Sequence, residues 1–324
     1  MGCKFYFGLL VVVFFSLSAC TLSGKPTIID SYIKDTGSLE VYFCPQEDCE
    51  GQLVSFLDSA QSSIHCALFE IDLPSVQDKL LEKRKLIEVE IVTDEQYLKE
   101  FNYSFVKPDS WGLMHNKFCI IDGKKVSSGS MNPTTNDAHK NNNNLLLIES
   151  SVLAGNYERE FQEMWNGVFK KGEEVLHPKI VLNEMPIENY FCPDDHCINR
   201  VVNAISQAKQ SVYFMTFSFT SREIANALLL AKERGVELKG VMETSQISQY
   251  SMYELLKFQG TDVQKDKNKK NLHHKVFIID NETIVTGSFN PTEGGDKRND
   301  ENVLIIKDKA IAEKFLKEFS IVYG

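Results

Sequence analysis

The sequence predicts an α/β fold built from two similar halves, and three observations support this prediction. A pattern of six residues, H-x-K-x4-D-x6-G-S-x-N, occurs twice at a constant offset of 158 residues (273 − 115 = 158). A second pattern, F-C-P-x3-C, begins at Phe43 and again at Phe191, an offset of 148 residues (191 − 43 = 148). Between these patterns, short apolar runs alternate with amphipathic stretches, as strands and helices do in a layered fold.

Length and composition fit two globular units. The chain has 324 residues, of which 43% are hydrophobic and 25% charged. Such a chain suits roughly two domains of about 150 residues, each with an ordinary core. The formal net charge of −10 weakly opposes non-specific binding to nucleic acid or to an anionic membrane, although a local basic patch can overrule it.

The N-terminus has the features of an export signal, which we assign to residues 1–19. Lys4 supplies a positive charge, and the apolar run from Phe5 to Leu17 is short for a membrane span. The run ends in Leu-Ser-Ala-Cys20, similar to a bacterial lipobox, in which the cysteine becomes the first residue and carries lipid. We therefore expect an exported lipoprotein of the cell envelope with a tether at residues 20–38. A plain signal peptide or an uncleaved anchor is the alternative.

The two halves are predicted at residues 39–170 and 189–324, joined by a polar linker at 171–188 that contains Pro178 and Pro186. Apolar runs predict strands at Ile64–Phe69, Val89–Val92, Val212–Phe219 and Val236–Met242. Helical spacing of apolar residues predicts helices at Leu53–Ala60, Glu158–Trp165, Arg222–Arg234 and Ala310–Phe319. Gly235 is expected to end the third of these helices.

The offset between the halves grows along the chain, so the second half contains an insertion of ten residues (158 − 148 = 10) before its motif. The sequence suggests that it lies near Lys265 to Asn271. Four lysines fall there, Lys265, Lys267, Lys269 and Lys270, directly before His273. They form either an ordinary solvated loop or a basic lining of the substrate entrance.

Each copy of the first pattern carries groups suited to phosphodiester cleavage. The first copy consists of His115, Lys117, Asp122, Gly129, Ser130 and Asn132, and the second of His273, Lys275, Asp280, Gly287, Ser288 and Asn290. An apolar run, a turn at the aspartate and a second apolar run predict a β-hairpin. Residues i and i+2 share one face of a strand, so the histidine and lysine point to one place. We expect the serine and asparagine side chains to bind the same phosphate.

Two imidazoles can overcome the resistance of a phosphodiester to attack. One, neutral, attacks phosphorus and forms a phospho-histidine, while the other, protonated, donates to the leaving oxygen and later accepts a proton from water. Lysine and asparagine donors stabilise the charge that develops on the non-bridging oxygens. This chemistry needs no metal or other cofactor, and we expect none.

Both copies resemble the signature of the phospholipase D superfamily, which includes phospholipases D, cardiolipin synthases and hydrolases, and Nuc-type endonucleases. The resemblance extends over nearly all of the chain after the export signal. It implies a duplicated phospholipase D-like α-β-α sandwich in a monomer with internal pseudo-two-fold symmetry, and an active site at the interface between the halves. It further implies that His115 is the nucleophile, and that Asp122 and Asp280, although part of the catalytic motif, are mainly structural.

One position downstream of the motifs distinguishes the halves. Glu301 lies 28 residues after His273 (301 − 273 = 28), whereas Asn143 lies 28 residues after His115 (143 − 115 = 28). Family members often use an acid here to orient a catalytic imidazole, and the resemblance implies that this contact crosses the interface. Glu301 would then orient His115 and raise its basicity, while Asn143 would orient without raising it. Alternatively, Glu301 only caps a strand.

The eight cysteines sort by their context. Cys3 is lost with the signal, and Cys20 is the proposed lipid site. Cys66 and Cys119 lie in apolar strands and are interpreted as buried hydrophobic side chains. In an exported protein, the two C-P-x3-C segments predict the disulfides Cys44–Cys49 and Cys192–Cys197, and a zinc site made of all four is the alternative.

Three classes of function follow. The first is a membrane-anchored hydrolase or transphosphatidylase of phospholipase D type, with phospholipid as its substrate. The second is an exported endonuclease of the same superfamily that cleaves DNA or RNA. The third, a non-catalytic surface lipoprotein, is disfavoured because both motifs are complete. The expected anchor and the acidic net charge favour the first class, and the lysine-rich stretch keeps the second open.

Overall fold

The computed structural model describes residues 1–2, 32–109 and 112–324. Residues 32–324 form one compact unit. Apart from Met1 and Gly2, the predicted signal peptide lies outside the described residues, as does the predicted lipidation site Cys20. No helix in the described part of the chain combines the length and apolar character needed to cross a membrane.

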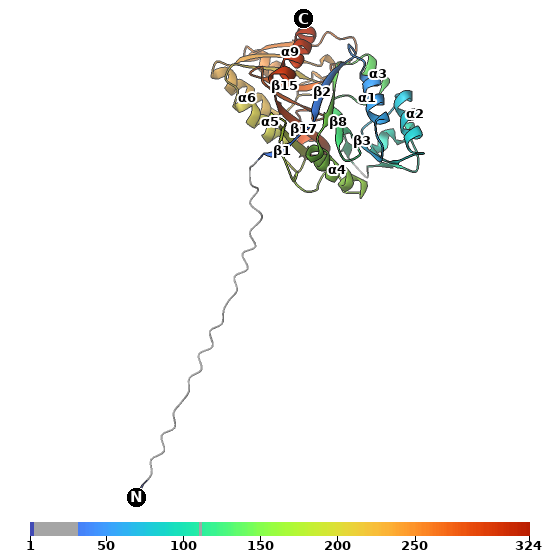
Figure 1. The fold of residues 1–324 in the computed structure, drawn as a ribbon. Coiled ribbons are helices and arrows are strands. Elements are labelled where there is room, and N and C mark those ends of the chain that lie inside the picture. The colour runs from blue at the N-terminus through green and yellow to red at the C-terminus, as the bar shows by residue number, and fades with distance from the viewer. Residues whose placement is uncertain (3–31, 110–111) are drawn as a thin grey trace. The chain divides into compact units, whose positions relative to one another are not determined.

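Two sheets with the same strand order form the framework of this unit (Figure 1). The first contains, in spatial order, β2 (Ser38–Cys44), β9 (Asn143–Glu149), β8 (Lys125–Gly129), β7 (Lys117–Ile121), β3 (Ser63–Leu68), β4 (Glu88–Thr93) and β5 (Val106–Pro108). The second repeats it with β11 (Met185–Cys192), β17 (Asn299–Lys307), β16 (Thr283–Gly287), β15 (Lys275–Ile279), β12 (Ser211–Thr216), β13 (Glu237–Met242) and β14 (Asp262–Lys265). Each half therefore contributes one copy of the same sheet.

Helices cover both faces of each sheet. They are α1 (Cys49–Asp58), α2 (Pro74–Lys83), α3 (Thr135–His139), α4 (Ser151–Trp165), α5 (Cys197–Ser206), α6 (Arg222–Glu233), α7 (Tyr253–Phe258), α8 (Glu293–Lys297) and α9 (Lys309–Tyr323), with 3-10 helices η1 (Glu95–Glu100) and η2 (Thr244–Gln246). Figure 1 shows α1 and α2 on one side of the unit and α5 and α6 on the other. Each pair packs on its own sheet in a separate core.

A third core joins the halves and explains why they form one unit. It contains Tyr157 and Phe161 of α4, Phe315 of α9, and apolar side chains from the facing strands of both sheets. These aromatic side chains are fully buried. Burying large apolar surface against both sheets favours a fixed arrangement of the halves. The predicted duplicated α/β sandwich is confirmed.

The segment predicted as a linker contains regular structure. Strand β10 (Lys179–Leu182) pairs antiparallel with β11 and parallel with β1 (Ile33–Asp35), which lies in the predicted tether. Ile180 and Leu182 are buried on one face, in the alternation of a half-buried strand. Regular structure therefore lies within both the predicted linker and the predicted tether.

The insertion in the second half also lies elsewhere than predicted. Ile91 of β4 and Gly240 of β13 are at equivalent positions (240 − 91 = 149), and their partners Val106 and Val263 are offset by 157 (263 − 106 = 157). Most of the insertion therefore precedes β14. It contains α7, whose Leu256 is fully buried. The sequence has no matched landmark in this region, and the polar stretch after Lys265 was the wrong place for it.

Three disulfides lie in the described residues. Cys44–Cys49 and Cys192–Cys197 follow the predicted pairing rather than the alternative zinc site. Cys66 and Cys119 are buried as predicted but are bonded to each other, which corrects their interpretation as free hydrophobic side chains. They face each other in the antiparallel pair β3–β7 with Cα atoms 4.1 Å apart, because that register places the two side chains opposite one another.

Candidate active site

The two motif histidines are held in place by the opposite half of the protein. His115 follows the short strand β6 (Leu113–Met114), which pairs with β17 of the second half, and its N–H donates to the carbonyl of Asp300 at 3.0 Å. Likewise, the N–H of His273 donates to the carbonyl of Asn142 at 2.9 Å. Each motif is therefore anchored across the interface, as expected for a site shared between the halves.

A buried lysine accompanies each histidine. The residues His115, Lys117, His273 and Lys275 are 6%, 3%, 8% and 2% exposed. Each lysine Nζ donates to the backbone carbonyl of its own histidine, at 2.7 Å for Lys117 and 2.8 Å for Lys275. An aromatic ring completes each pair: the centroid of Phe69 lies 5.0 Å from that of His115, and Phe217 lies 5.0 Å from His273. The histidine and lysine of each motif therefore lie in one buried site, with an aromatic ring on one side of it.

The imidazoles are oriented through Nδ1 by side chains of the other half. Oε2 of Glu301 lies 2.8 Å from Nδ1 of His115, and Oδ1 of Asn143 lies 2.9 Å from Nδ1 of His273. An acceptor at Nδ1 favours the tautomer that carries its proton there. Nε2 of each ring is then the nitrogen available for chemistry.

The two imidazoles and two lysine amines share one electrostatic environment. Burial lowers the pKa of His115 well below its ordinary value, and Lys117, Lys275 and His273 lower it further. Burial also lowers the pKa of His273 to about 4 and that of Lys117 to about 8. The pKa of Lys275 falls because of burial and the charge of Lys117. Groups of one half perturb those of the other, so the two pairs form a single site whose imidazoles are neutral without substrate.

Glu301 is a fully buried carboxyl with three neighbouring donors. Burial raises its pKa to about 7, while the charge of Lys117 and hydrogen bonds from Asn299 and Ser288 oppose the rise. Asn299 Nδ2 donates to Oε1 at 3.1 Å, and Ser288 Oγ donates to Oε2 at 2.8 Å. Glu301 therefore does more than cap β17, because its side chain faces the imidazole of the other half.

The predicted phosphate ligands separate into two groups. Ser130 and Ser288 are fully buried, and their hydroxyls donate to Asn143 (3.3 Å) and Glu301 (2.8 Å). Both hydroxyls hold the orienting side chains, and their expected contact with phosphate stays a prediction. Asn132 donates through Nδ2 to Asp137 at 2.8 Å. In the second half, the residue equivalent to Asp137 is Gly295 (295 − 137 = 158), so Asn290 has no such carboxylate partner there.

The motif aspartates lie at the far ends of the strands. Asp122 follows β7, so it is five residues from Lys117, a distance of roughly 17 Å along a strand. Its carboxylate accepts hydrogen bonds from the N–H groups of residues 61, 62 and 63, and that of Asp280 accepts from residues 209, 210 and 211. Although burial opposes ionisation, these bonds lower the pKa of both carboxyls. Both aspartates fasten a hairpin to the neighbouring strand, and neither contacts the imidazoles.

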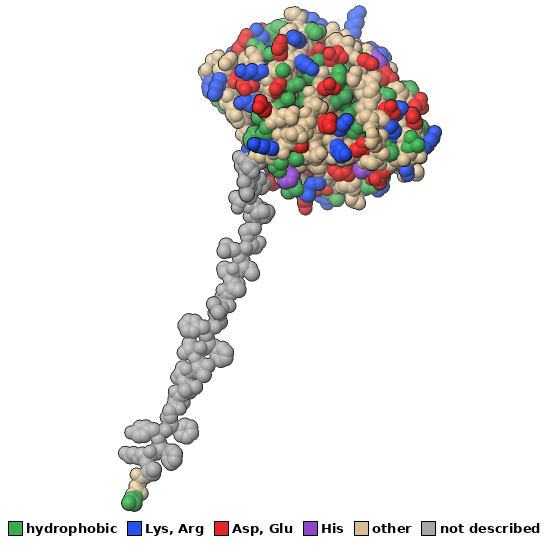
Figure 2. All heavy atoms as spheres, in the orientation of Figure 1, with side chains coloured by type: hydrophobic (Ala, Val, Ile, Leu, Met, Phe, Trp, Pro, Cys, Tyr) green, Lys and Arg blue, Asp and Glu red, His purple; other side chains and the backbone are tan. Residues whose placement is uncertain are grey.

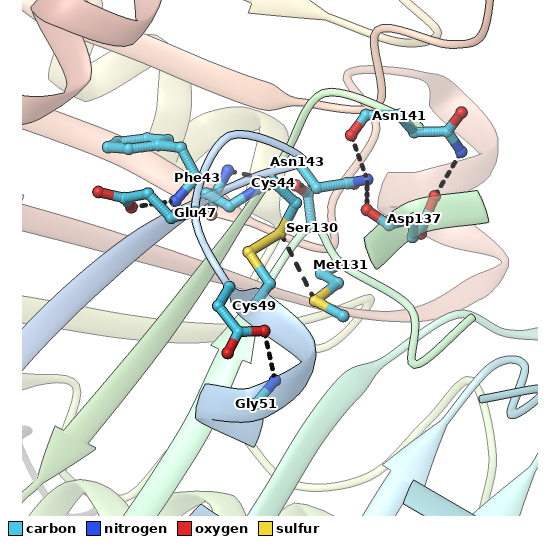
Figure 3. The surroundings of a disulfide bond; sticks show 12 residues. Phe43, Cys44, Glu47, Cys49, Gly51, Ser130, Met131, Asp137, Asn141 and Asn143 are labelled. Carbon is cyan, nitrogen blue, oxygen red and sulfur yellow. Dashed lines mark hydrogen bonds between the residues drawn. A yellow bond between two sulfur atoms is a disulfide. The ribbon is translucent and has the colours of Figure 1, made fainter. Parts of the chain in front are cut away.

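The disulfides Cys44–Cys49 and Cys192–Cys197, which close short loops, lie beside the residues that orient the imidazoles. In the sheet registers, Cys44 is the direct partner of Asn143, and Cys192 is the direct partner of Glu301. Figure 3 shows the Cys44–Cys49 bond near Met131 and Asn143. The two disulfides therefore constrain the ends of β2 and β11, beside the residues that orient the imidazoles.

A buried carboxylate in the site was not singled out from the sequence. Asp137, near the start of α3, is 3% exposed, and its Oδ2 lies 3.2 Å from Nδ1 of His273. The available signal was an acid five residues after Asn132, in the half that lacks a glutamate at position 143. A group with metal-ligand spacing among the described residues, His65, Glu88 and Glu90, shares no residue with this site.

Comparisons with known proteins agree with the geometry. The family model described as "Cardiolipin synthase, PLD-like domain" matches residues 53–165 and 201–322, one stretch in each half. A phospholipase D of Rickettsia conorii is 35% identical over 139 residues, covering 43% of this chain and 70% of that protein. The mitochondrial cardiolipin hydrolase of Homo sapiens is 31% identical over 150 residues, covering 45% of this chain and 59% of the hydrolase.

A solved structure extends the similarity to the whole fold. The phosphatidylserine synthase of Haemophilus influenzae superposes with a TM-score of 0.66 at 13% identity, covering 86% of this chain and 85% of that one. At this identity the likeness concerns the fold alone. The family match in both halves, with a complete motif in each, places the chain by sequence as well. The chain belongs to the phospholipase D superfamily of phosphodiesterase-type hydrolases.

Proposed function

We propose that the protein hydrolyses glycerophospholipids to phosphatidic acid through a phospho-histidine intermediate. The observation that supports this most is the pair of buried His–Lys sets, each with its imidazole held at Nδ1 by the opposite half. Such a pair offers a nucleophile and a general acid on a single phosphate. No cofactor takes part in the steps we propose.

His115 is the proposed nucleophile. Its Nε2 forms a bond to phosphorus while the bond from phosphorus to the head-group oxygen breaks, and His273 gives its proton to that oxygen. Water then attacks the phospho-histidine, His273 takes a proton from the water, and the N–P bond breaks. Phosphatidic acid leaves and both imidazoles return to their starting states. Lys117, Lys275 and the amides of Asn132 and Asn290 are the proposed donors to the non-bridging oxygens.

Substrate binding supplies the protonation state that this scheme needs. Without substrate, burial and mutual repulsion keep both imidazoles neutral, because their pKa values are lowered. A phosphodiester anion placed among the four groups favours their charged forms, since an opposite charge within a few ångströms raises the pKa of a base. His273 is therefore expected to gain its proton together with the substrate.

Phospholipid is the proposed substrate for two reasons. Relatives that are 31–35% identical carry lipid-hydrolase names, phospholipase D and cardiolipin hydrolase. The predicted lipid on Cys20, outside the described residues, would hold the site near a bilayer, where phosphodiesters are abundant. We further propose that the protein is an anchored lipoprotein of the cell envelope. Labelling with a radioactive fatty acid should mark the wild type but not Cys20→Ser.

An endonuclease is the second candidate, and the lysine-rich loop favours it. Lys265, Lys267, Lys269 and Lys270 are exposed. The loop borders the site, because the N–H of Asn271 donates to Oδ1 of Asn141 and Asn268 donates to Oδ1 of Asn142. Elsewhere the charges are mixed: Figure 2 shows acidic and basic side chains intermingled over the visible face. Nucleic-acid binding usually needs several cations acting on phosphates, so we rank this function second.

One experiment separates the candidates. Purified protein is incubated with vesicles of phosphatidylglycerol and phosphatidylcholine or with single-stranded DNA, over a range of salt concentrations, with His115→Ala as the inactive control. Release of phosphatidic acid by the wild type alone supports our proposal. DNA cleavage that falls steeply with salt, with intact vesicles, would establish the nuclease instead.

A further inference from the structure

The site contains a carboxylate that belongs to neither copy of the motif. Building on the proposed function, we propose that Asp137 is the positioning carboxylate of His273 and replaces, from a different element, the group that Glu301 provides for His115. His273 thus has an acid partner even though the equivalent position in its orienting strand is Asn143.

In the second half, the carboxylate that faces the imidazole comes from a strand. Glu301, on β17, faces Nδ1 of His115 through Oε2 at 2.8 Å, while its other oxygen accepts from Asn299 at 3.1 Å. Gly295 in α8 is close to the backbone: a Cβ atom there would lie 2.6 Å from the carbonyl oxygen of Asn290. A side chain at position 295 would require a shift of the backbone, and in this half the carboxylate is supplied by β17.

In the first half, the helix α3 supplies the carboxylate that faces Nδ1 of the imidazole. Oδ2 of Asp137 lies 3.2 Å from Nδ1 of His273, beside Oδ1 of Asn143 at 2.9 Å, so both oxygens face the Nδ1 position of the ring. Oδ2 also accepts from the N–H and the Nδ2 of Asn132, both at 2.8 Å. Asp137 is therefore fixed from several sides and aimed at the imidazole.

The supporting amide occupies the same position in both halves, whereas the carboxylate does not. Asn141 donates to Oδ1 of Asp137 at 2.6 Å, and its counterpart Asn299 (299 − 141 = 158) donates to Oε1 of Glu301 at 3.1 Å. Figure 3 shows Asp137 between Asn141 and Asn143, and Asn143 donates to its backbone carbonyl at 3.2 Å. Each half therefore keeps one carboxylate, one supporting asparagine and one serine contact around the imidazole it orients.

A carboxylate changes the chemistry of the ring in a way that an amide does not. Asn143 alone can hold the ring in position, whereas a carboxylate also stabilises the protonated imidazole by its charge. His273 needs that proton when the head-group oxygen leaves. Burial opposes ionisation of Asp137, but the proximity of His273 and the hydrogen bonds from Asn141 and Asn132 keep its pKa well below the ordinary value. The carboxylate is thus charged at neutral pH.

The test compares Asp137→Asn with a variant that transplants the second-half arrangement, Asp137→Gly with Asn143→Glu. Asp296→Asn is the matched control: this buried aspartate lies on α8 and accepts from the N–H of Ile198 at 2.7 Å. The first readout is the proton resonance of imidazole Nδ1, assigned with His115→Ala and His273→Ala. A ring that donates to a carboxylate has this resonance far downfield, and no substrate is needed to observe it.

We expect Asp137→Asn to move the His273 resonance upfield while that of His115 stays in place. The double variant should return it, and Asp296→Asn should leave both unchanged. An Asp137→Asn protein that is folded by circular dichroism and keeps the wild-type His273 resonance would overturn the proposal, whatever its activity.

The second readout is catalysis with two leaving groups. Asp137→Asn should lower kcat for phosphatidylglycerol by roughly 10–100-fold with little change in KM, as is typical when the partner of an active histidine is lost. The loss should be smaller for phosphatidyl-p-nitrophenol, whose leaving group needs little protonation. Equal losses on both substrates would contradict a role through His273. A wild type inactive on both, with the resonance shifts as expected, would refute the proposed function and leave the Asp137 contact standing.

Discussion

The disulfide between Cys66 and Cys119 should stabilise the protein more than Cys44–Cys49 or Cys192–Cys197, which close short loops. It joins β3 to β7, the strand that begins with Lys117, and closes a loop with a sequence separation of 53. Cys44–Cys49 closes a loop with a separation of only 5. A cross-link removes more entropy from the unfolded chain when the loop it closes is longer. Loop length therefore predicts an order of stabilities.

The expected sizes follow from the loop lengths. The chain-entropy relation gives about 4 kcal/mol for the long loop and about 2 kcal/mol for the short one at 25 °C. Replacing both cysteines of a pair by alanine also removes packing, but this cost is matched, because all four side chains are buried. The difference between the two double variants should thus be about 2 kcal/mol and reflect the cross-link itself.

Equilibrium unfolding in urea measures this difference. Cys66→Ala with Cys119→Ala and Cys44→Ala with Cys49→Ala are compared with the oxidised wild type, and all three are repeated under reducing conditions. Under oxidising conditions, the variant that lacks Cys66–Cys119 should have the lower urea midpoint of unfolding. The difference between the midpoints of the two variants should change when the remaining disulfides are reduced. Equal unfolding midpoints for the two variants under oxidising conditions would show that constraint of the unfolded chain does not determine their stabilities.

Four further predictions concern the reaction. His115→Ala should abolish turnover and leave no phospho-enzyme, whereas His273→Ala should still form one slowly from phosphatidyl-p-nitrophenol, as acid quenching and mass spectrometry would show; phosphate on residue 273 would reverse the roles. Activity should survive EDTA, and loss restored by a divalent cation would refute the two-histidine scheme. Burial raises the pKa of Glu301 to about 7, so kcat/KM should rise with pH through that value as the carboxyl ionises, and Glu301→Gln should lack this rise. Lys267→Ala with Lys269→Ala should raise KM for phosphatidylglycerol vesicles more than for phosphatidylcholine vesicles; equal effects would exclude a role of the loop in recognising anionic head groups.

Repetition in the sequence made much of the fold predictable. The two motif copies and the two C-P-x3-C segments locate equivalent strands in both halves, and the periodicity around Arg222 and Leu53 locates helices. The contact between Glu301 and His115 could be anticipated only through the family resemblance, because the residues are 186 positions apart. A linear pattern states which residues recur, but not which of them meet across an interface.

Several differences between the sequence analysis and the structure concern pairings rather than residue types. Cys66 and Cys119 were correctly predicted as buried, yet their bond depends on the register of β3 against β7. Ser130 and Ser288 carry suitable hydroxyls, but each donates to the orienting residue of its own half. Asp137 was missed because comparison at a constant offset sets it against Gly295. The shared target, Nδ1 of an imidazole, is visible only in three dimensions.

Charge balance explains why each half supplies one carboxyl group to the site. Lys117 and Lys275 bring two buried positive charges to the site, and Glu301 and Asp137 bring two carboxyl groups. An uncompensated buried charge is costly, so an asparagine at position 143 without an acid at 137 would leave the two lysines facing a single carboxylate. In the state with both acids ionised, both lysines protonated and both imidazoles neutral, the charges of these six groups cancel. A phosphodiester then adds one negative charge, which one proton on His273 neutralises, so the balance that stabilises the fold also provides the general acid when the substrate is present.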